Sequence, residues 1–151
     1  MIKFLIYGWK MGKSIRLNNV KIFTSYFDNK EKLLNLGYKN LVSIAGKCPN
    51  DFVSTRLNDN RCWEYKKLAP KYNWWKEWHD NHLSNEWYIK KYYETVLNKL
   101  NQYDVLTELN RNDNDIILLC WETPNLFCHR HIISDWFKKA GFNCNEIEVN
   151  K

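Results

Sequence analysis

Ile116-Ile117-Leu118-Leu119-Cys120 is the clearest buried strand in this sequence, and the chain runs on from it through Trp121-Glu122-Thr123-Pro124-Asn125-Leu126-Phe127-Cys128-His129-Arg130. An uninterrupted apolar run of this kind is typical of a strand covered on both faces, as in parallel sheets. The apolar positions that follow have helical spacing and end at Gly141; they are Ile132, Ile133, Trp136, Phe137 and Ala140. The stretch therefore predicts a strand, a loop and a helix.

The flanking sequence supplies more strands and helices. A helix is predicted to begin at Asp28 and Glu31, which have capping-box spacing, and to end at Gly37, before a buried strand over residues 41–45. Further strands are expected at 2–7, 20–24 and 146–149, the first two joined by a turn near 16–19, and further helices at 85–100 and 104–109. This order predicts a single three-layer α/β domain over residues 1–151 with a mostly parallel, Rossmann-like sheet.

Residues 50–84 break this order, since they are rich in Asn, Lys and Trp and have no sustained period. We expect an insertion or long loop that carries short helices. Its rings alternate with lysines, so it could stack unpaired or extracted bases. It could equally be a lid packed on the sheet, with lysine stems covering the rings. The lid is favoured for Trp74 and Trp78, whereas Tyr72 and Trp75 fit both interpretations and are candidates for base binding.

The overall charge is basic. The sequence has 23 Lys and Arg against 17 Asp and Glu, a formal net charge of +6. Such a balance favours polyanionic partners such as DNA, RNA or a nucleotide. Aromatic residues make up 16% of the chain, more than one small core needs, so some are expected to line a surface. An AT-rich genome would produce a similar Asn- and Lys-rich composition without any such partner.

The five cysteines and the N-terminal residues bear on localisation. The apolar segment at 2–7 breaks off at Gly8-Trp9-Lys10, too early for a signal peptide, and no apolar run is long enough to span a bilayer. We therefore expect a cytoplasmic protein with reduced thiols and no membrane partner. Nothing in the sequence specifies an oligomeric state.

The loop that ends in Cys128-His129-Arg130 carries the candidate chemistry. It leads into a helix N-terminus, where free N–H groups and the helix dipole favour an anion. There Arg130 could hold a phosphate or carboxylate, Cys128 could be a nucleophile with a lowered pKa, and Glu122 could be a general acid or base. The alternatives are a structural Glu122–Arg130 ion pair, a Cys120 that only fills the core, and a His131 on the solvated side of the helix.

Two more specific sites are disfavoured by spacing. A phosphatase-type phosphate loop needs an Arg at a fixed distance after its Cys, and the corresponding positions after Cys120 and Cys128 hold Leu126 and Ser134. A zinc site could draw on Cys120, Cys128, His129, His131 and Cys48. However, the chain has no CxxC pair, and adjacent Cys and His residues rarely bind one tetrahedral ion. We therefore expect no metal and no cofactor.

Several segments together resemble the domain-of-unknown-function 488 (DUF488) family, from about residue 20 to about residue 148. They are Phe23-Thr24-Ser25-Tyr26-Phe27, Leu41-Val42-Ser43-Ile44-Ala45-Gly46-Lys47-Cys48-Pro49, Leu68-Ala69-Pro70, and Leu118-Leu119-Cys120-Trp121-Glu122 followed by Cys128-His129-Arg130. The resemblance implies an α/β fold with these segments gathered at one end of the sheet. Thr24, Ser25 and Tyr26 are therefore candidates to join His129 and Arg130 in binding a substrate or anion.

The leading hypothesis is a protein that interacts with nucleic acid and, in its sharper form, processes a base or nucleotide, as a glycosylase or nuclease does. The resemblance implies a link to nucleic-acid processing of this kind. One alternative is a small-molecule enzyme with Cys128 as nucleophile on a phosphorylated or carboxylated substrate. Another is a binding protein without catalysis. The sequence is compatible with an enzyme and with a non-enzyme.

Overall fold

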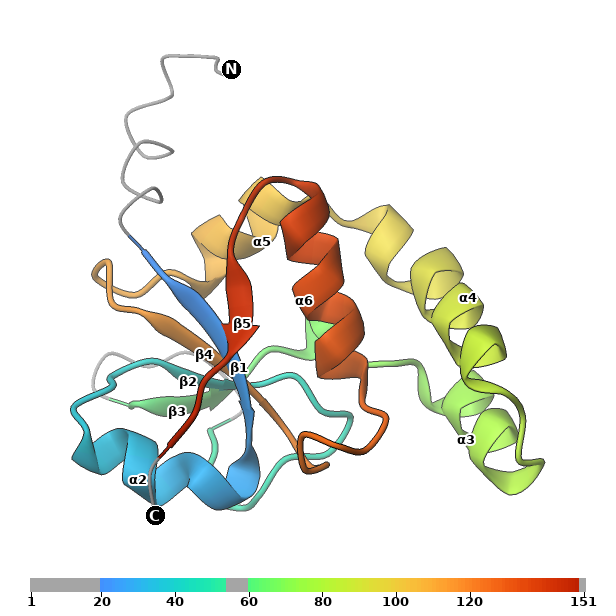
Figure 1. Cartoon of the computed structure of the whole chain (residues 1–151), viewed down its shortest axis with the longest axis horizontal. Coiled ribbons are helices and arrows are strands. Elements are labelled where there is room, and N and C mark those ends of the chain that lie inside the picture. Colours follow the sequence, from blue (N-terminus) through green and yellow to red (C-terminus); the bar gives the residue numbers. More distant parts are fainter. Residues whose placement is uncertain (1–19, 54–59, 150–151) are drawn as a thin grey trace.

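The computed structural model describes residues 20–53 and 60–149, so the strand predicted at 2–7 and the turn at 16–19 lie outside the described residues. Within them the chain forms a five-stranded sheet in the order β3–β2–β4–β1–β5, and every neighbouring pair is parallel (Figure 1). The strands are β1 (Ile22–Tyr26), β2 (Leu41–Ser43), β3 (Cys62–Glu64), β4 (Ile116–Cys120) and β5 (Cys144–Glu146). The predicted parallel α/β sheet is confirmed.

Strand β4 lies at the centre of the sheet. It pairs with β1 on one side and with β2 on the other, and all five of its residues are buried. This agrees with its sequence, because a central parallel strand has no solvent-exposed face and can be apolar throughout. Tyr26 at the end of β1 is in register with Cys120, and Ser43 at the end of β2 is in register with Leu119. The carboxyl ends of the three strands therefore meet at one edge.

The connection from β1 to β2 contains a 3-10 turn (Phe27–Asn29) and helix α2 (Lys30–Asn35). The predicted capping box is wrong. Asn29 is the N-cap, no side chain caps the helix, and the Asn29 amide instead donates to the Ser25 hydroxyl at 3.0 Å. Gly37, with a φ of +98°, ends the segment as predicted, because glycine adopts this left-handed conformation without strain. The crossover passes over β4, since β1 and β2 are not neighbours.

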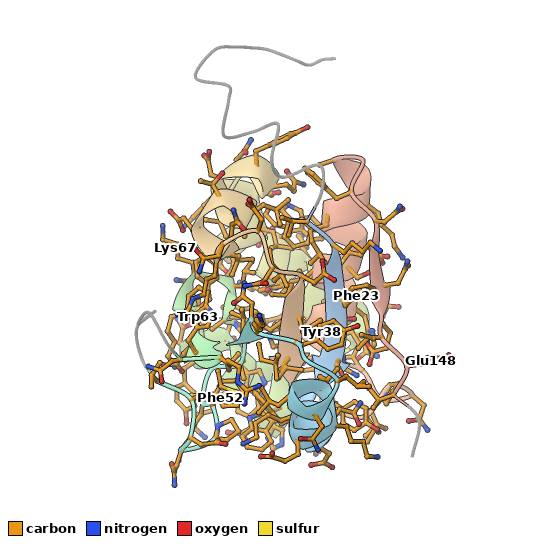
Figure 2. The ribbon with its side chains drawn as sticks, turned by 90° about the vertical axis from the view of Figure 1, so that its left-hand side faces the viewer. Phe23, Tyr38, Phe52, Trp63, Lys67 and Glu148 are labelled. Atoms are coloured by element: carbon orange, nitrogen blue, oxygen red, sulfur yellow. The ribbon has the colours of Figure 1, made fainter. Side chains whose placement is uncertain are left out.

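Helices cover both faces of the sheet, as a three-layer domain requires (Figure 1). Successive residues of a strand point to opposite faces. Ser25 accepts its hydrogen bond from Asn29 beside α2, whereas Thr24 donates to Glu146, which also pairs with Arg130 of α6 (His129–Lys139). Helices α2 and α6 therefore lie on opposite faces. Figure 2 shows Phe23 and Tyr38 together near α2, with ring centroids 6.5 Å apart.

The remaining helices follow the predicted order. They are α3 (Tyr72–Asp80), α4 (Asn85–Thr95), α5 (Gln102–Leu109) and the 3-10 turns Lys66–Leu68 and Leu97–Lys99. Helix α4 begins at Ser84, whose hydroxyl accepts from the Trp87 N–H at 3.0 Å. Helix α6 ends before Gly141, which has a φ of +91°. Helices α3 and α4 pack on each other beyond α6, at one side of the molecule (Figure 1).

The segment 50–84 is more than the expected insertion, because it contains β3, an edge strand of the sheet. Trp63 in the middle of β3 is buried, and its indole donates to the Asn40 side chain at 2.7 Å. The same Asn40 amide donates to the carbonyl of Leu109 in α5 at 2.9 Å. Sequence patterns missed β3 because a three-residue strand is too short to show an alternation.

Candidate active site

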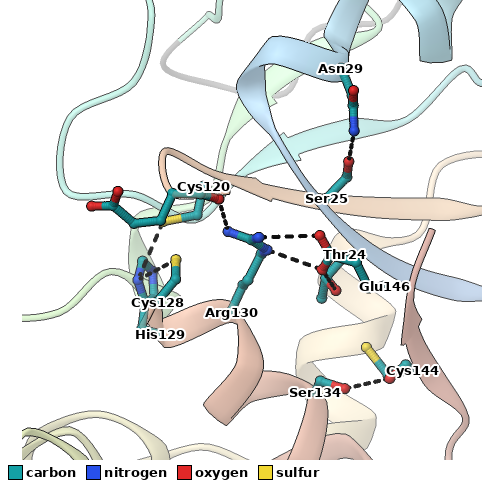
Figure 3. Close-up of polar contacts among 11 residues, drawn as sticks. Thr24, Ser25, Asn29, Cys120, Cys128, His129, Arg130, Ser134, Cys144 and Glu146 are labelled. Carbon is teal, nitrogen blue, oxygen red and sulfur yellow. Dashed lines mark hydrogen bonds and ion pairs between the residues drawn. The ribbon is translucent and has the colours of Figure 1, made fainter. Parts of the chain in front are cut away.

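Three reactive side chains converge where β4 ends and α6 begins. Cys120 is the last residue of β4, Cys128 immediately precedes α6, and His129 is its first residue. The His129 Nδ1 atom lies 3.5 Å from the sulfur of Cys120 and 3.9 Å from that of Cys128 (Figure 3). Each residue is at most 5% exposed. We call these three residues the Cys–Cys–His cluster.

The convergence of Cys128 and His129 corrects the expectation that adjacent Cys and His residues point to different places. Cys128 is the N-cap of α6 and has an extended backbone, with φ −153° and ψ 144°, whereas His129 is helical. The backbone changes direction between the two residues. Both side chains can therefore reach the same point, beside the end of β4.

The His129 ring is oriented by its second nitrogen. The Nε2 atom lies 2.7 Å from the backbone carbonyl of Ile44, the residue after β2. A carbonyl can only accept, so Nε2 carries a proton and donates it to this bond. In the neutral ring Nδ1 then presents its lone pair to the two sulfurs. The ring of Tyr92 from α4 meets the imidazole in a T-shaped contact at 5.6 Å and limits its rotation.

The two thiols of the cluster are not equivalent. The pKa of Cys128 is held well below its usual range, chiefly by the hydrogen bond from Cys120, against the opposing effect of burial. The backbone N–H of Arg130 acts in the same direction. The pKa of Cys120 is raised by the same hydrogen bond and by burial. Of the two thiols, Cys128 therefore ionises more readily, and the thiolate is the form that attacks electrophiles and binds metals.

Arg130 is placed differently from the predicted anion clamp. Its side chain is fully buried, and it forms a two-bond ion pair with Glu146 of β5, with both distances 3.1 Å. Its third contact is a 2.6 Å bond to the backbone carbonyl of Glu122. The guanidinium therefore bonds to other groups of the protein in the interior and is not available to a ligand. The alternative of a Glu122–Arg130 ion pair is also wrong, because the carboxylate partner is Glu146.

A family model described as the active DUF488-N3 subclade matches residues 46–141, which is well over half of the chain and includes the whole Cys–Cys–His cluster. The chain belongs to the DUF488 family. The resemblance seen in the sequence is confirmed. No curated protein and no solved structure gives a significant match. In this DUF488 chain, none of the helices within the described residues is long and apolar enough to cross a membrane.

The other predicted site residues of the DUF488 chain lie in different surroundings. Thr24 donates to Glu146 at 2.6 Å, and the Tyr26 ring lies 5.8 Å from the Arg130 guanidinium, so both support the ion pair. Glu122 is exposed, although its carbonyl is held by Arg130. Ser25 faces α2 and is not brought to the cluster. His131, expected on the solvated side, is half-buried, and its Nε2 has no hydrogen-bond partner within the described part of the chain.

Tyr72 and Trp75 lie on α3, outside the cluster. Their rings stack at 6.2 Å, and Trp75 stacks on His79 at 5.1 Å. Tyr72 is 69% exposed, so this stack faces solvent. Trp74, by contrast, is buried and donates to Thr95 of α4 at 2.9 Å. The base-binding interpretation therefore remains open for one face of α3, while its other face packs on the DUF488 fold.

Sequence reasoning missed three contributions to this site. The sequence favours a core-filling role for Cys120 over a ligand role, and it gives no sign of Glu146 or of the Ile44 carbonyl. Glu146 and Arg130 are both charged residues in predicted elements, but only strand order shows that β5 adjoins β1 and brings them together. The Ile44 carbonyl has no signal in the sequence, because any residue at that position provides one.

The ion pair gives a direct test of how α6 is held. Replacing Glu146 with alanine leaves the Arg130 charge buried, so we expect a loss of about 3 kcal/mol in the free energy of unfolding, measured by urea denaturation. Glu148→Ala removes an exposed carboxylate from the same segment and should change that free energy by less than about 0.5 kcal/mol. Equal effects of the two substitutions would contradict the role assigned to Glu146.

Proposed function

We propose that this DUF488 protein is an enzyme that processes a base or nucleotide, with the Cys–Cys–His cluster as its reaction centre. The observation that carries the proposal is the convergence of Cys120, Cys128 and His129 within 4.8 Å of one another. The cluster lies at the carboxyl ends of β1, β2 and β4, the edge at which α/β sheets bind their ligands. The description of the matching subclade as active agrees with it.

The three side chains of the cluster are almost completely covered, so a substrate can reach them only when neighbouring groups move. A surface hollow of about 480 Å³ exists elsewhere, lined by Ile89, Tyr93, Ile132, Asp135, Lys138 and Lys139, and none of the cluster residues borders it. The loop itself exposes Trp121 and Leu126, by 53% and 54%. We therefore propose that the loop opens to admit a substrate and that its apolar side chains contact it.

Glu122 is the proposed general acid or base. It follows Cys120 by two positions and keeps its carboxylate exposed, while the bond from Arg130 to its carbonyl fixes its backbone beside the start of α6. Cys128 and His129 would contact the reacting atoms. In this arrangement Arg130 does not bind the substrate; it positions both the loop and the helix that supply these groups.

Two features favour nucleic acid as the substrate class: the positive net charge of the chain and the aromatic rings on α3. The chain carries a net charge of +6, and the Tyr72–Trp75–His79 stack offers flat faces on which bases can stack. Helix α3 also contacts the loop, since Trp78 packs on Phe127 at 5.8 Å. A nucleic-acid strand bound to α3 would therefore lie on a helix that packs against the loop between Cys120 and Cys128.

Binding can be tested with fluorescently labelled single-stranded oligonucleotides. We expect affinity to fall as salt rises, because phosphate contacts release counterions. The double variant Tyr72→Ala/Trp75→Ala should bind at least about fivefold more weakly, since stacking contributes about 1–3 kcal/mol per base. Tyr103→Ala, which removes a 46% exposed ring from α5, is the matched control and should bind like the wild type. Binding that is absent at low salt would rule out this substrate class.

Turnover requires a separate measurement. Oligonucleotides and nucleotides are incubated with excess protein, and released bases or cleaved strands are identified by mass spectrometry. We expect product from the wild type and at least about a hundredfold less from Glu122→Gln if it transfers the proton. Glu77→Gln, an exposed carboxylate on α3, is the control and should retain turnover. The absence of product from every nucleic acid and nucleotide tested would refute the proposed activity.

A further inference from the structure

We infer that Cys120, Cys128 and His129 bind one zinc ion, through two thiolates and the imidazole Nδ1, and leave a fourth coordination position open to water or substrate. This names a cofactor for the reaction centre, and only the catalytic use of the open position rests on the proposed function. Binding of the ion itself does not. The inference also reverses the expectation from sequence spacing that the chain holds no metal.

The distances within the cluster fit a zinc tetrahedron. Zinc bound at about 2.3 Å to sulfur and about 2.0 Å to nitrogen places a sulfur and a nitrogen about 3.5 Å apart and two sulfurs about 3.8 Å apart. The two sulfur–nitrogen separations in the protein are 3.5 Å and 3.9 Å. The three donor atoms all lie within 4.8 Å of one another. An ion can therefore enter with only small side-chain adjustments.

The orientation of His129 also suits a ligand. Histidines that bind metals almost always donate their other ring N–H to a carbonyl or carboxylate, which fixes the tautomer and turns the free nitrogen to the ion. Here Nε2 donates to the Ile44 carbonyl at 2.7 Å, and Nδ1 faces both sulfurs. This bond comes from the end of β2, so the sheet itself holds the ring in the ligating orientation.

The donor set and the burial select the type of ion. Two sulfurs and one imidazole suit zinc, whereas magnesium and calcium require oxygen ligands. Zinc with two thiolates and a neutral imidazole has no net charge. Each residue of the cluster is at most 5% exposed. Burying a neutral group in such a site costs less free energy than burying a charged one.

The number of protein ligands points to an open site. Every cysteine and histidine of the sequence lies in the described residues, and the cluster contains only three of them. Structural zinc sites have four protein ligands, whereas a catalytic site, including the Cys₂His type, keeps one position for water or substrate. Zinc-bound water ionises near neutral pH, and a zinc ion also polarises a bound carbonyl or phosphoryl oxygen. Ionised zinc-bound water or a polarised oxygen could each promote a reaction on a base or nucleotide.

The test is metal analysis of protein purified under reducing conditions without chelators. We expect close to one zinc per chain by inductively coupled plasma mass spectrometry. Cys120→Ser, Cys128→Ser and His129→Gln should each lower zinc affinity at least about tenfold. Cys144→Ser removes another buried thiol, and His131→Gln another imidazole of α6; both are controls that should keep the ion.

A second measurement uses the wild type alone, so it does not depend on how the variants fold. The protein is stripped with a chelator and titrated with cobalt(II), which should produce a thiolate-to-cobalt charge-transfer band that saturates at one equivalent and is abolished by zinc. If the reduced wild type shows neither bound zinc nor this band, the inference is overturned. Full zinc retention by Cys128→Ser would also overturn it.

The two proposals can fail separately. Stoichiometric zinc in a protein that processes no nucleic acid would uphold the metal site and refute the proposed activity. Turnover that is unchanged in zinc-free protein would refute the catalytic use of the open position and uphold the activity, while binding of the ion would still be decided by the metal analysis. Tyr72→Ala/Trp75→Ala should retain its zinc whatever its affinity for oligonucleotides, because neither ring contributes to the cluster.

Discussion

The ion pair between Arg130 and Glu146 is the interaction on which the site depends. It joins the first turn of α6 to β5, and Thr24 of β1 donates to the same carboxylate. The remaining Arg130 bond holds the carbonyl of Glu122 and so anchors the loop that follows β4. A fully buried charge tolerates little displacement from its partner, because an unpaired guanidinium is costly in the interior. The pair therefore fixes where α6 begins, and with it the positions of Cys128 and His129.

Much of the fold was predictable because its strongest pattern lies at its centre. The apolar run at 116–120 has no polar position, as expected of a strand flanked by two others and covered on both faces. The glycines at 37 and 141 mark real helix ends, since both have positive φ. Strand β3 escaped prediction because it is short and its burial comes from an edge pairing with β2. The capping box failed because Asn29 bonds to Ser25 and leaves the helix uncapped.

The structure gives the residues of the predicted site different contacts from those expected. The sequence places Cys128, His129 and Arg130 together at a helix start, and it predicts that Arg130 binds the phosphate or carboxylate of a ligand. The structure buries Arg130 and brings Cys120 to the histidine instead. Residue spacing could not show this, because it depends on the extended backbone of Cys128 and on the Ile44 carbonyl across the sheet edge. The sequence predicts an anion site here. The short distances from His129 Nδ1 to the two sulfurs, the burial of Arg130 and the tautomer of His129 indicate a set of sulfur and nitrogen donors instead.

We infer that Cys120, Cys128 and His129 act together as one metal-binding centre. X-ray absorption spectroscopy at the zinc edge of the purified protein tests it most directly, because it reports the atoms bonded to the ion. We expect about two sulfurs at about 2.3 Å and about two nitrogen or oxygen atoms at about 2.0 Å from the zinc ion. A first shell of nitrogen and oxygen alone, or of four sulfurs, would contradict it.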